Sequence, residues 1–247
     1  MSKTISKFQF KQFSVSHHRS SMKVGVDGVL IGCWTSTQDA RRILDVGTGC
    51  GLIALILAQR APAASIDAID IDAPSIEEAS ENISASPWSE RLNAVLCKYS
   101  DALSLLKGEE DRYDLIVSNP PYFNSGVTKT VTAREKARHQ GELSPFSLLN
   151  GAKRLLKNGG SVAMVVPAEM SLSIEEEAAA LGFGLARRCL VRGHDESPYK
   201  RSLLQWRFGS DVEKKRMVAE EFLTLETSSG GPTNEYRALC KDFYLKF

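Results

Sequence analysis

The sequence predicts an α/β fold in which a mostly parallel sheet carries helices on both of its faces. Nearly continuous apolar runs alternate with segments of helical composition through much of the chain. Strands of a parallel sheet are buried on both faces and joined by helical crossovers, so they read as unbroken apolar runs. Two late apolar runs have no helix between them, which predicts an antiparallel hairpin at the end of the sheet.

The predicted elements follow one another in a regular order. The second helix begins with a proline and the third is followed by glycines, as is typical of helix starts and ends. Strands are predicted within 41–47, 65–72, 92–103, 113–120 and 161–169, helices within 50–61, 74–86, 144–160 and 174–182, and the hairpin within 185–193 and 201–209. The tail, from 220–226 to 241–247, is expected to return against the body.

Composition limits the class of protein. The 247 residues fit one α/β domain, and a net charge of +1 means that any nucleic-acid contact must come from local basic patches. Five dispersed cysteines without a CxxC pair favour free thiols in a reducing compartment over disulfides or a zinc ribbon. The N-terminus lacks an apolar signal segment, and the longest apolar run, 52–58, is too short to cross a membrane. We therefore expect a cytoplasmic protein without a membrane partner.

A glycine-rich loop follows the first strand, in the stretch LDVGTGCGLIAL (44–55). Gly47, Gly49 and Gly51 allow a tight turn and a close approach of the backbone to a ligand at the start of a helix. The spacing is GxGxG rather than the GxGxxG of dinucleotide sites, and Asp45 precedes it. An acid there would repel a pyrophosphate but could bind an ammonium group, which favours S-adenosylmethionine over NAD.

Two further acids are spaced as a nucleoside would require. Asp70 ends the second strand, where a carboxylate can accept both ribose hydroxyls. Asp72 is the weaker candidate, because strand alternation turns only every second side chain to one face. Asp101 follows the third strand and could meet the adenine amino group.

The fourth strand ends in the motif VSNPPYF (117–123), at the same sheet edge as the glycine loop. At this motif the chain resembles the class I S-adenosylmethionine-dependent methyltransferases that methylate amino groups and carry an NPPY sequence. The resemblance implies a Rossmann-like, seven-stranded, mostly parallel sheet that ends in an antiparallel hairpin. It also implies S-adenosylmethionine as cofactor and S-adenosylhomocysteine as product, without a metal.

The motif suits a nitrogen that is a weak nucleophile, because the lone pair of an exocyclic adenine amine is delocalised into the ring. We expect the amide oxygen of Asn119 and the carbonyl of Pro120 to accept its two N–H groups, so that the lone pair turns toward the methyl group. Pro120 and Pro121 fix the backbone in advance, and Tyr122 offers a face on which a flipped base can stack. Asn119 is thereby expected to face the cofactor as well. Such an in-line displacement depends on orientation and requires no metal.

NPPY enzymes differ in the amino group they methylate, and the alternatives are adenine N6, guanine N2 of ribosomal RNA and a protein glutamine amide. Only residues 1–40 precede the first strand, whereas the glutamine enzymes carry a separate helical domain there. The ribosomal guanine enzymes are often duplicated and larger. Adenine N6 is therefore favoured, with the other two acceptors as alternatives.

Residues 1–40 are expected to form an N-terminal extension, and 41–247 the methyltransferase domain. Within the extension, MKVGVDGVLIGCW (22–34) resembles the segment that covers the methionine end of the cofactor in this family. The resemblance implies cofactor contacts at Lys23, Asp27 and Gly28. Val26 departs from the family, in which a threonine would precede the aspartate.

Other stretches resemble one branch of the family, the bacterial tRNA(Val) adenine-N6 methyltransferases. These are FNSG after the motif, AREKARHQGELS (133–144), SPYKRSLLQW (197–206) and EYRALCKDFYLKF (235–247). The resemblance covers nearly the whole chain. It implies methylation of adenine 37, next to the anticodon of a valine tRNA, with tRNA as the partner and no obligate protein partner.

Basic residues near the motif and the hairpin are candidate RNA contacts, although solvated charged loops are an equal alternative. They are Lys129, Arg134, Lys136, Arg138 and His139 after the motif, and Arg187, Arg188, Arg192, Lys200 and Arg201 around the hairpin. Phe8, Phe10 and Phe13 alternate with lysines, and we interpret them as an edge strand rather than an RNA-binding arm. The four histidines lack metal-ligand spacing.

Overall fold

The structure is a computed structural model that describes residues 7–20, 22–121, 143–209, 218 and 220–247. Its strands are β1 (Phe8–Gln9), β2 (Ser14–Val15), β3 (Arg42–Val46), β4 (Ser65–Asp70), β5 (Leu92–Leu96), β6 (Tyr113–Ser118), β7 (Leu156–Pro167), β8 (Phe183–His194), β9 (Arg201–Phe208) and β10 (Glu220–Glu226). Its α-helices are α1 (Val26–Trp34), α2 (Leu52–Arg60), α3 (Ala73–Ser84), α5 (Pro145–Leu155), α6 (Ser171–Ala180) and α7 (Asn234–Cys240).

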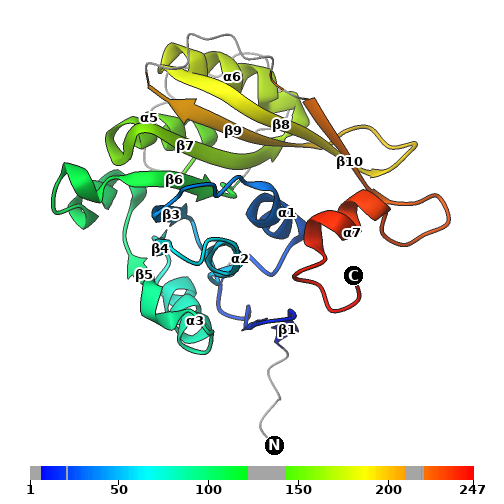
Figure 1. The fold of residues 1–247 in the computed structure, drawn as a ribbon, viewed down its shortest axis with the longest axis horizontal. Coiled ribbons are helices and arrows are strands. Elements are labelled where there is room, and N and C mark those ends of the chain that lie inside the picture. The colour runs from blue at the N-terminus through cyan, green and yellow to red at the C-terminus, as the bar shows by residue number, and fades with distance from the viewer. Residues whose placement is uncertain (1–6, 21, 122–142, 210–217, 219) are drawn as a thin grey trace, which may run out of the picture.

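The described strands from β3 onward form one eight-stranded sheet in the order β10-β8-β9-β7-β6-β3-β4-β5 (Figure 1). Strands β3 to β7 pair in parallel, and β9 runs antiparallel to both of its neighbours, β7 and β8. The predicted mostly parallel sheet with a terminal hairpin is therefore confirmed. The sheet also has an eighth strand beyond the seven predicted, because the returning tail pairs in parallel with β8 as β10.

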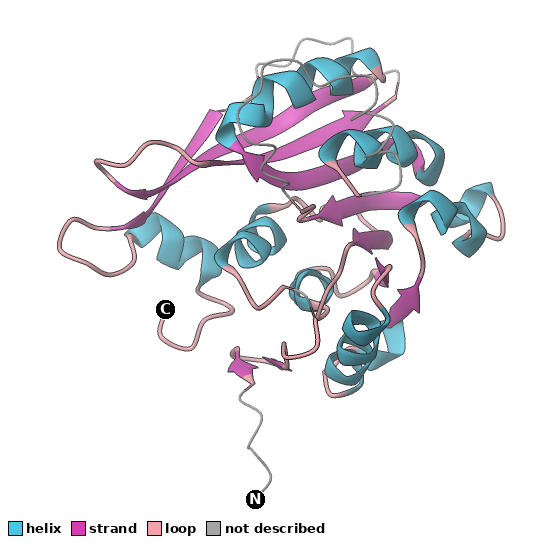
Figure 2. Ribbon diagram, turned by 180° about the vertical axis from the view of Figure 1, so that it is seen from behind, coloured by secondary structure: helices cyan, strands magenta, loops and turns pink. Residues whose placement is uncertain are grey.

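Helices cover both faces of the sheet, as Figures 1 and 2 show. One apolar core lies between the sheet and α1, α2, α3 and α7, and a second lies between the sheet and α5 and α6. Because both faces are covered, the central strands are buried nearly throughout, which explains their unbroken apolar sequences. No helix of the described residues is long and apolar enough to span a membrane.

Helix α5 ends earlier than predicted. Ser144 caps its start in a reciprocal pair with Ser147, but the helix stops at Leu155 instead of continuing to the glycines at 159 and 160. Leu156 pairs with Tyr113 of β6, and an irregularity follows before Leu115 pairs with Ser161. Gly159 has a left-handed φ of 80°. The glycines that suggested a helix end therefore lie in an irregular start of β7.

The aromatic N-terminal stretch is structural, as expected. β1 and β2 form a small antiparallel pair, and Phe10 and Phe13 are buried with their rings stacked 4.6 Å apart. Phe10 also forms an isolated bridge with Tyr244, near the other end of the chain. The strand interpretation is therefore confirmed for Phe8, in β1, and for Phe10, in the bridge, whereas Phe13 lies between β1 and β2.

Candidate active site

The glycine loop and the Asn-Pro-Pro motif leave the sheet side by side. β3 and β6 are parallel neighbours in which Val46 pairs with Ser118, and the Ser118 hydroxyl donates a 2.7 Å hydrogen bond to the Val46 carbonyl. Gly47 and Asn119 are the next residues of the two strands. Both therefore lie at the carboxyl edge of the sheet, where open α/β sheets bind ligands.

The conformation of the loop explains its glycines. Gly47, Gly49 and Gly51 have φ values of 71°, 54° and 83°, in the left-handed region that other residues rarely adopt. The N–H groups of Gly47 and Thr48 donate to the carbonyl of Ile69, at the end of β4. A Cβ atom placed on Gly49 would meet no heavy atom within 4 Å. The crest of the loop thus has open space in front of it.

Asp45 fixes the loop from inside the protein. Its side chain is fully buried, and its Oδ2 accepts hydrogen bonds from the Thr48 hydroxyl at 2.6 Å and from the Ala54 N–H at 3.1 Å. Its Oδ1 has no hydrogen-bond partner among the described residues. Burial raises the pKa of Asp45 to about 7, against the effect of these two donors. The site therefore holds a carboxylate oxygen that a cationic partner could satisfy.

Asp70 and Asp72 have different local roles. The Gly49 N–H donates to Asp70 Oδ2 at 2.9 Å, which ties the glycine loop to the end of β4. Asp70 Oδ1 accepts the N–H of Asp72 at 3.0 Å. Asp72 itself caps α3 by accepting from the N–H and the hydroxyl of Ser75. Of the two acids, Asp70 is the one whose carboxylate contacts the glycine loop.

The predicted contacts before and within α1 lie in different environments. Lys23 is exposed, whereas Gly28 is buried, and a Cβ atom on Gly28 would lie 3.1 Å from Leu52 Cδ2 of α2. The structure thus accounts for Gly28 by helix packing. Asp27 forms an ion pair with Arg201, a residue that the sequence had suggested for RNA. Burial raises the pKa of Asp27, and the charge of Arg201 opposes that rise.

The remaining predicted residues are distributed around the same edge or lie outside the described residues. Asp101 is exposed in the 3-10 helix η2 (Tyr99–Leu105), and its Oδ1 accepts the Ser100 hydroxyl at 2.9 Å. Asn119 is half-buried, Pro120 is buried, and Pro121 and Lys200 are exposed. The residues outside the described ranges are Tyr122, Lys129, Arg134, Lys136, Arg138 and His139.

Sequence reasoning missed two residues of α3 that contact the N-terminal segment, Glu78 and Asn82. Both are buried, together with Ser75 and Ala79 on the same face of the helix. The sequence did contain a signal that these polar side chains are buried, because they occur at helical spacing on a face that also carries Ile76 and Ile83. A polar residue on such a face requires a hydrogen-bond partner, which the sequence alone does not identify.

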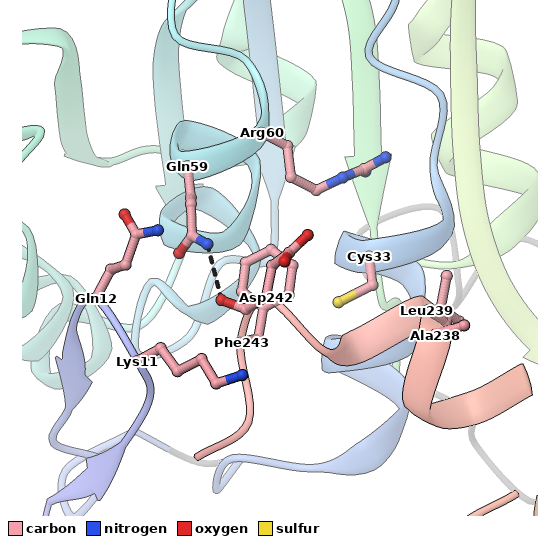
Figure 3. Close-up of a pocket in the computed structure, with 9 residues that line it drawn as sticks. All are labelled: Lys11, Gln12, Cys33, Gln59, Arg60, Ala238, Leu239, Asp242 and Phe243. Atoms are coloured by element: carbon pink, nitrogen blue, oxygen red, sulfur yellow. Dashed lines mark hydrogen bonds between the residues drawn. The ribbon is translucent and has the colours of Figure 1, made fainter. Parts of the chain in front are cut away.

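A pocket of about 580 Å³ lies at the opposite end of α2, away from the glycine loop (Figure 3). Arg60 donates to the carbonyls of Gly32 and Thr35, and the Gln59 amide donates to the carbonyl of Asp242. These polar side chains thus join α1, α2 and the C-terminal segment.

Among the described residues, no three or more His, Cys, Asp or Glu side chains are grouped so that they could hold a metal.

The fold and the site together define a class I methyltransferase. The family model described as "Methyltransferase small domain" matches residues 27–176. The chain is similar to the tRNA1(Val) (adenine(37)-N6)-methyltransferase of Bacteroides fragilis, with 42% identity over 243 residues that cover 97% of this chain and 98% of the relative. It is 37% identical to the enzyme of that name from Yersinia pestis, over 97% of this chain and 94% of the relative. The chain belongs to the family of tRNA1(Val) (adenine(37)-N6)-methyltransferases.

Solved structures support the fold. Protein Atu636 from Agrobacterium tumefaciens, named a predicted O-methyltransferase, matches with a TM-score of 0.65 and 16% identity, over 88% of this chain and 96% of that chain. A methyltransferase from Pyrococcus furiosus matches with a TM-score of 0.59 and 19% identity, over 80% of this chain and 90% of that chain. At these identities the likeness concerns the fold alone.

Proposed function

We propose that this chain transfers a methyl group from S-adenosylmethionine to N6 of adenine 37 in tRNA(Val), next to the anticodon. The observation that carries the proposal is the pairing of Val46 with Ser118, after which the glycine loop and Asn119 follow at one edge of the sheet. The near full-length similarity to enzymes named for this reaction supports the substrate. The cytoplasm is the proposed location, since that is where tRNA is modified in bacteria.

The residues at the edge fit the cofactor. The unpartnered Oδ1 of Asp45 suits its ammonium group, and the open space at Gly49 admits a ligand against the backbone. Asp70 would accept from the ribose hydroxyls and Asp101 from the adenine amino group, because each carboxylate oxygen has more than one lone pair. Lys23 and Asp27 would approach the methionine end. When bound, S-adenosylmethionine supplies a methyl group activated by its positively charged sulfur.

The chain contributes orientation at the acceptor nitrogen. The side-chain oxygen of Asn119 and the carbonyl of Pro120 would accept the two N–H groups of adenine N6, which directs its lone pair away from the ring plane. Neither oxygen is a base at neutral pH, so the proton lost after methylation goes to water. Because both acceptors sit on a rigid backbone, little reorganisation is needed during the reaction.

RNA contacts are proposed for the surroundings of this edge. Lys200 is exposed beside Arg201, whose pairing with Pro167 of β7 puts the hairpin tip at the carboxyl edge. We propose Lys200 as a phosphate contact. Arg201 is proposed to act on RNA only indirectly, since it already pairs with Asp27. Tyr122 is proposed to stack on the flipped base, and Lys129, Arg134 and Arg138 to contact the RNA backbone.

The test is the variant Asn119→Ala, assayed with labelled S-adenosylmethionine and a tRNA(Val) transcript. We expect turnover to fall ~100-fold or more, while S-adenosylhomocysteine binding measured by calorimetry stays within a factor of about three. A transcript with guanine at position 37 is the substrate control and should accept no label. Full turnover by the variant would refute the role of Asn119. In a second assay the unaltered protein and labelled S-adenosylmethionine are added to a cell extract. Label that enters only the protein of the extract would refute tRNA as the substrate.

A further inference from the structure

A buried carboxylate on α3 binds the backbone of the N-terminal segment. Glu78 Oε1 accepts the N–H of His18 at 2.7 Å, Oε2 accepts the N–H of Ser20 at 2.9 Å, and both oxygens lie 3.2 Å from the N–H of Arg19. Burial raises the pKa of Glu78, but the donors at Ser20, His18 and Arg19 outweigh it and lower the pKa overall. Three consecutive N–H groups thus converge on one side chain.

Asn82 makes the second connection, one helical turn further along α3. Its Oδ1 accepts the N–H of Ser16 at 2.9 Å, and its Nδ2 donates to the carbonyl of Ser16 at 2.8 Å. The same Nδ2 donates to the carbonyl of Cys50, inside the glycine loop, at 2.9 Å. One amide therefore joins the N-terminal segment directly to the loop that faces the ligand edge.

The segment then passes from the α3 side of the loop to the α2 side. A Cβ atom on Gly51 would lie 3.4 Å from the Cβ of Ala79, so α3 packs against the loop between Glu78 and Asn82. The Val24 N–H donates to His17 Nδ1 at 3.1 Å, which folds the segment back before α1 begins. Gly28 of α1 then packs on Leu52, the first residue of α2. Residues 16–20 are therefore held on the α3 flank of the glycine loop, and Gly28 is held on its α2 flank.

Apolar side chains would fill the same face of α3 without the cost of burying a carboxylate and an amide. Glu78 and Asn82 instead fix the position and orientation of the segment's backbone, because its N–H and carbonyl groups must meet oxygen and nitrogen atoms held by α3. We propose that Glu78 and Asn82 are positioning residues for cofactor binding, which act by holding residues 16–20 against the glycine loop. The inference rests on the proposed function, since it assumes that S-adenosylmethionine binds at this loop.

The first test compares Glu78→Gln with Glu81→Gln. Both variants change a glutamate of α3 to its amide, but the carboxylate of Glu81 is 65% exposed and pairs with the Arg19 side chain instead of the backbone. We expect Glu78→Gln to weaken S-adenosylhomocysteine binding and raise the KM for S-adenosylmethionine ~10-fold or more. The kcat and the KM for tRNA should stay within about twofold, and Glu81→Gln should match the parent protein. Equal changes in all three parameters, or none, would overturn the proposal.

The second test uses the unaltered protein, so it does not depend on the folding of a variant. If opening of residues 16–20 abolishes cofactor binding, saturation with S-adenosylhomocysteine at 100 times its Kd must slow amide exchange of His18, Arg19 and Ser20 by ~100-fold. The Arg237 amide in α7, which donates to the Thr233 carbonyl, serves as the control. Unchanged exchange at residues 18–20 in protein that binds the ligand would overturn the inference and leave the proposed function standing. Absence of ligand binding by the unaltered protein would instead refute the proposed function.

Discussion

Replacing Asp45 with asparagine tests how a buried carboxylate links the stability of this fold to pH. The side chain is fully buried, and burial raises its pKa from 3.8 to about 7. The folded protein therefore keeps this proton up to about pH 7, whereas the unfolded chain releases it near pH 4. The contribution of Asp45 to stability is therefore largest below its unfolded pKa and is lost as pH rises through its folded pKa.

The magnitude follows from the difference between the two pKa values. About three pKa units at 1.36 kcal/mol each correspond to a loss of about 4 kcal/mol in the free energy of unfolding between pH 4 and pH 7. Asp45→Asn carries no charge, and its amide oxygen can still accept from Thr48 and Ala54. The variant should therefore be more stable than the parent protein at pH 8, by about 2–4 kcal/mol, and should have no advantage at pH 4.

Urea unfolding followed by circular dichroism at pH 4.5, 6 and 8 measures this difference. Asp242→Asn, at an exposed carboxylate, is the control and should follow the parent protein. Asp45→Asn should also bind S-adenosylhomocysteine more weakly than the parent protein, because the proposed partner of the ligand's ammonium group is gone. A stability difference between Asp45→Asn and the parent that does not change from pH 4.5 to pH 8 would refute the reasoning.

Two further changes test packing and pairing. Gly32→Ala should destabilise the protein by about 1 kcal/mol in urea unfolding, because the new Cβ would lie 2.9 Å from Ile56 Cγ2. This overpacking outweighs the gain in helix propensity. A stabilised variant would contradict the prediction. Arg201→Ala should cost about 1 kcal/mol more at pH 8 than at pH 5, because it leaves the Asp27 carboxylate without its cation, while the 39% exposure of Arg201 limits the effect. An equal loss at both pH values would show that Asp27 is not the cause.

Local sequence patterns were sufficient for most of the sheet and for placing the glycine loop and the Asn-Pro-Pro motif at one edge of it. Apolar runs mark buried strands wherever they occur, and glycines that require positive φ mark the loop after β3 independently of the rest of the chain. Parallel strands put their carboxyl ends at one edge, so Asp45 and Asn119 could be assigned to the same edge from order alone. These features depend on residues close together in the sequence.

The features that were missed depend on contacts between distant residues. The segment of β10 alternates as a strand does, but nothing in it indicates that Phe222 would pair with Leu190 of β8. Asp27 and Arg201 were assigned to different ligands because their proximity arises only when β9 is added beside β7. The end of α5 was misjudged because glycines mark both helix ends and irregular strand starts.

Residues 10–11 contact residues 243–244, which has a consequence for when the N-terminal segment can fold during translation. Phe10 bridges to Tyr244, and the Lys11 N–H donates to the Phe243 carbonyl at 2.8 Å. The strand pair that leads into residues 16–20 therefore lacks its aromatic support until residues 243–244 have left the ribosome. If residues 16–20 position the cofactor as proposed, full occupancy of the methyl-donor site is expected only once residues 243–244 have been synthesised.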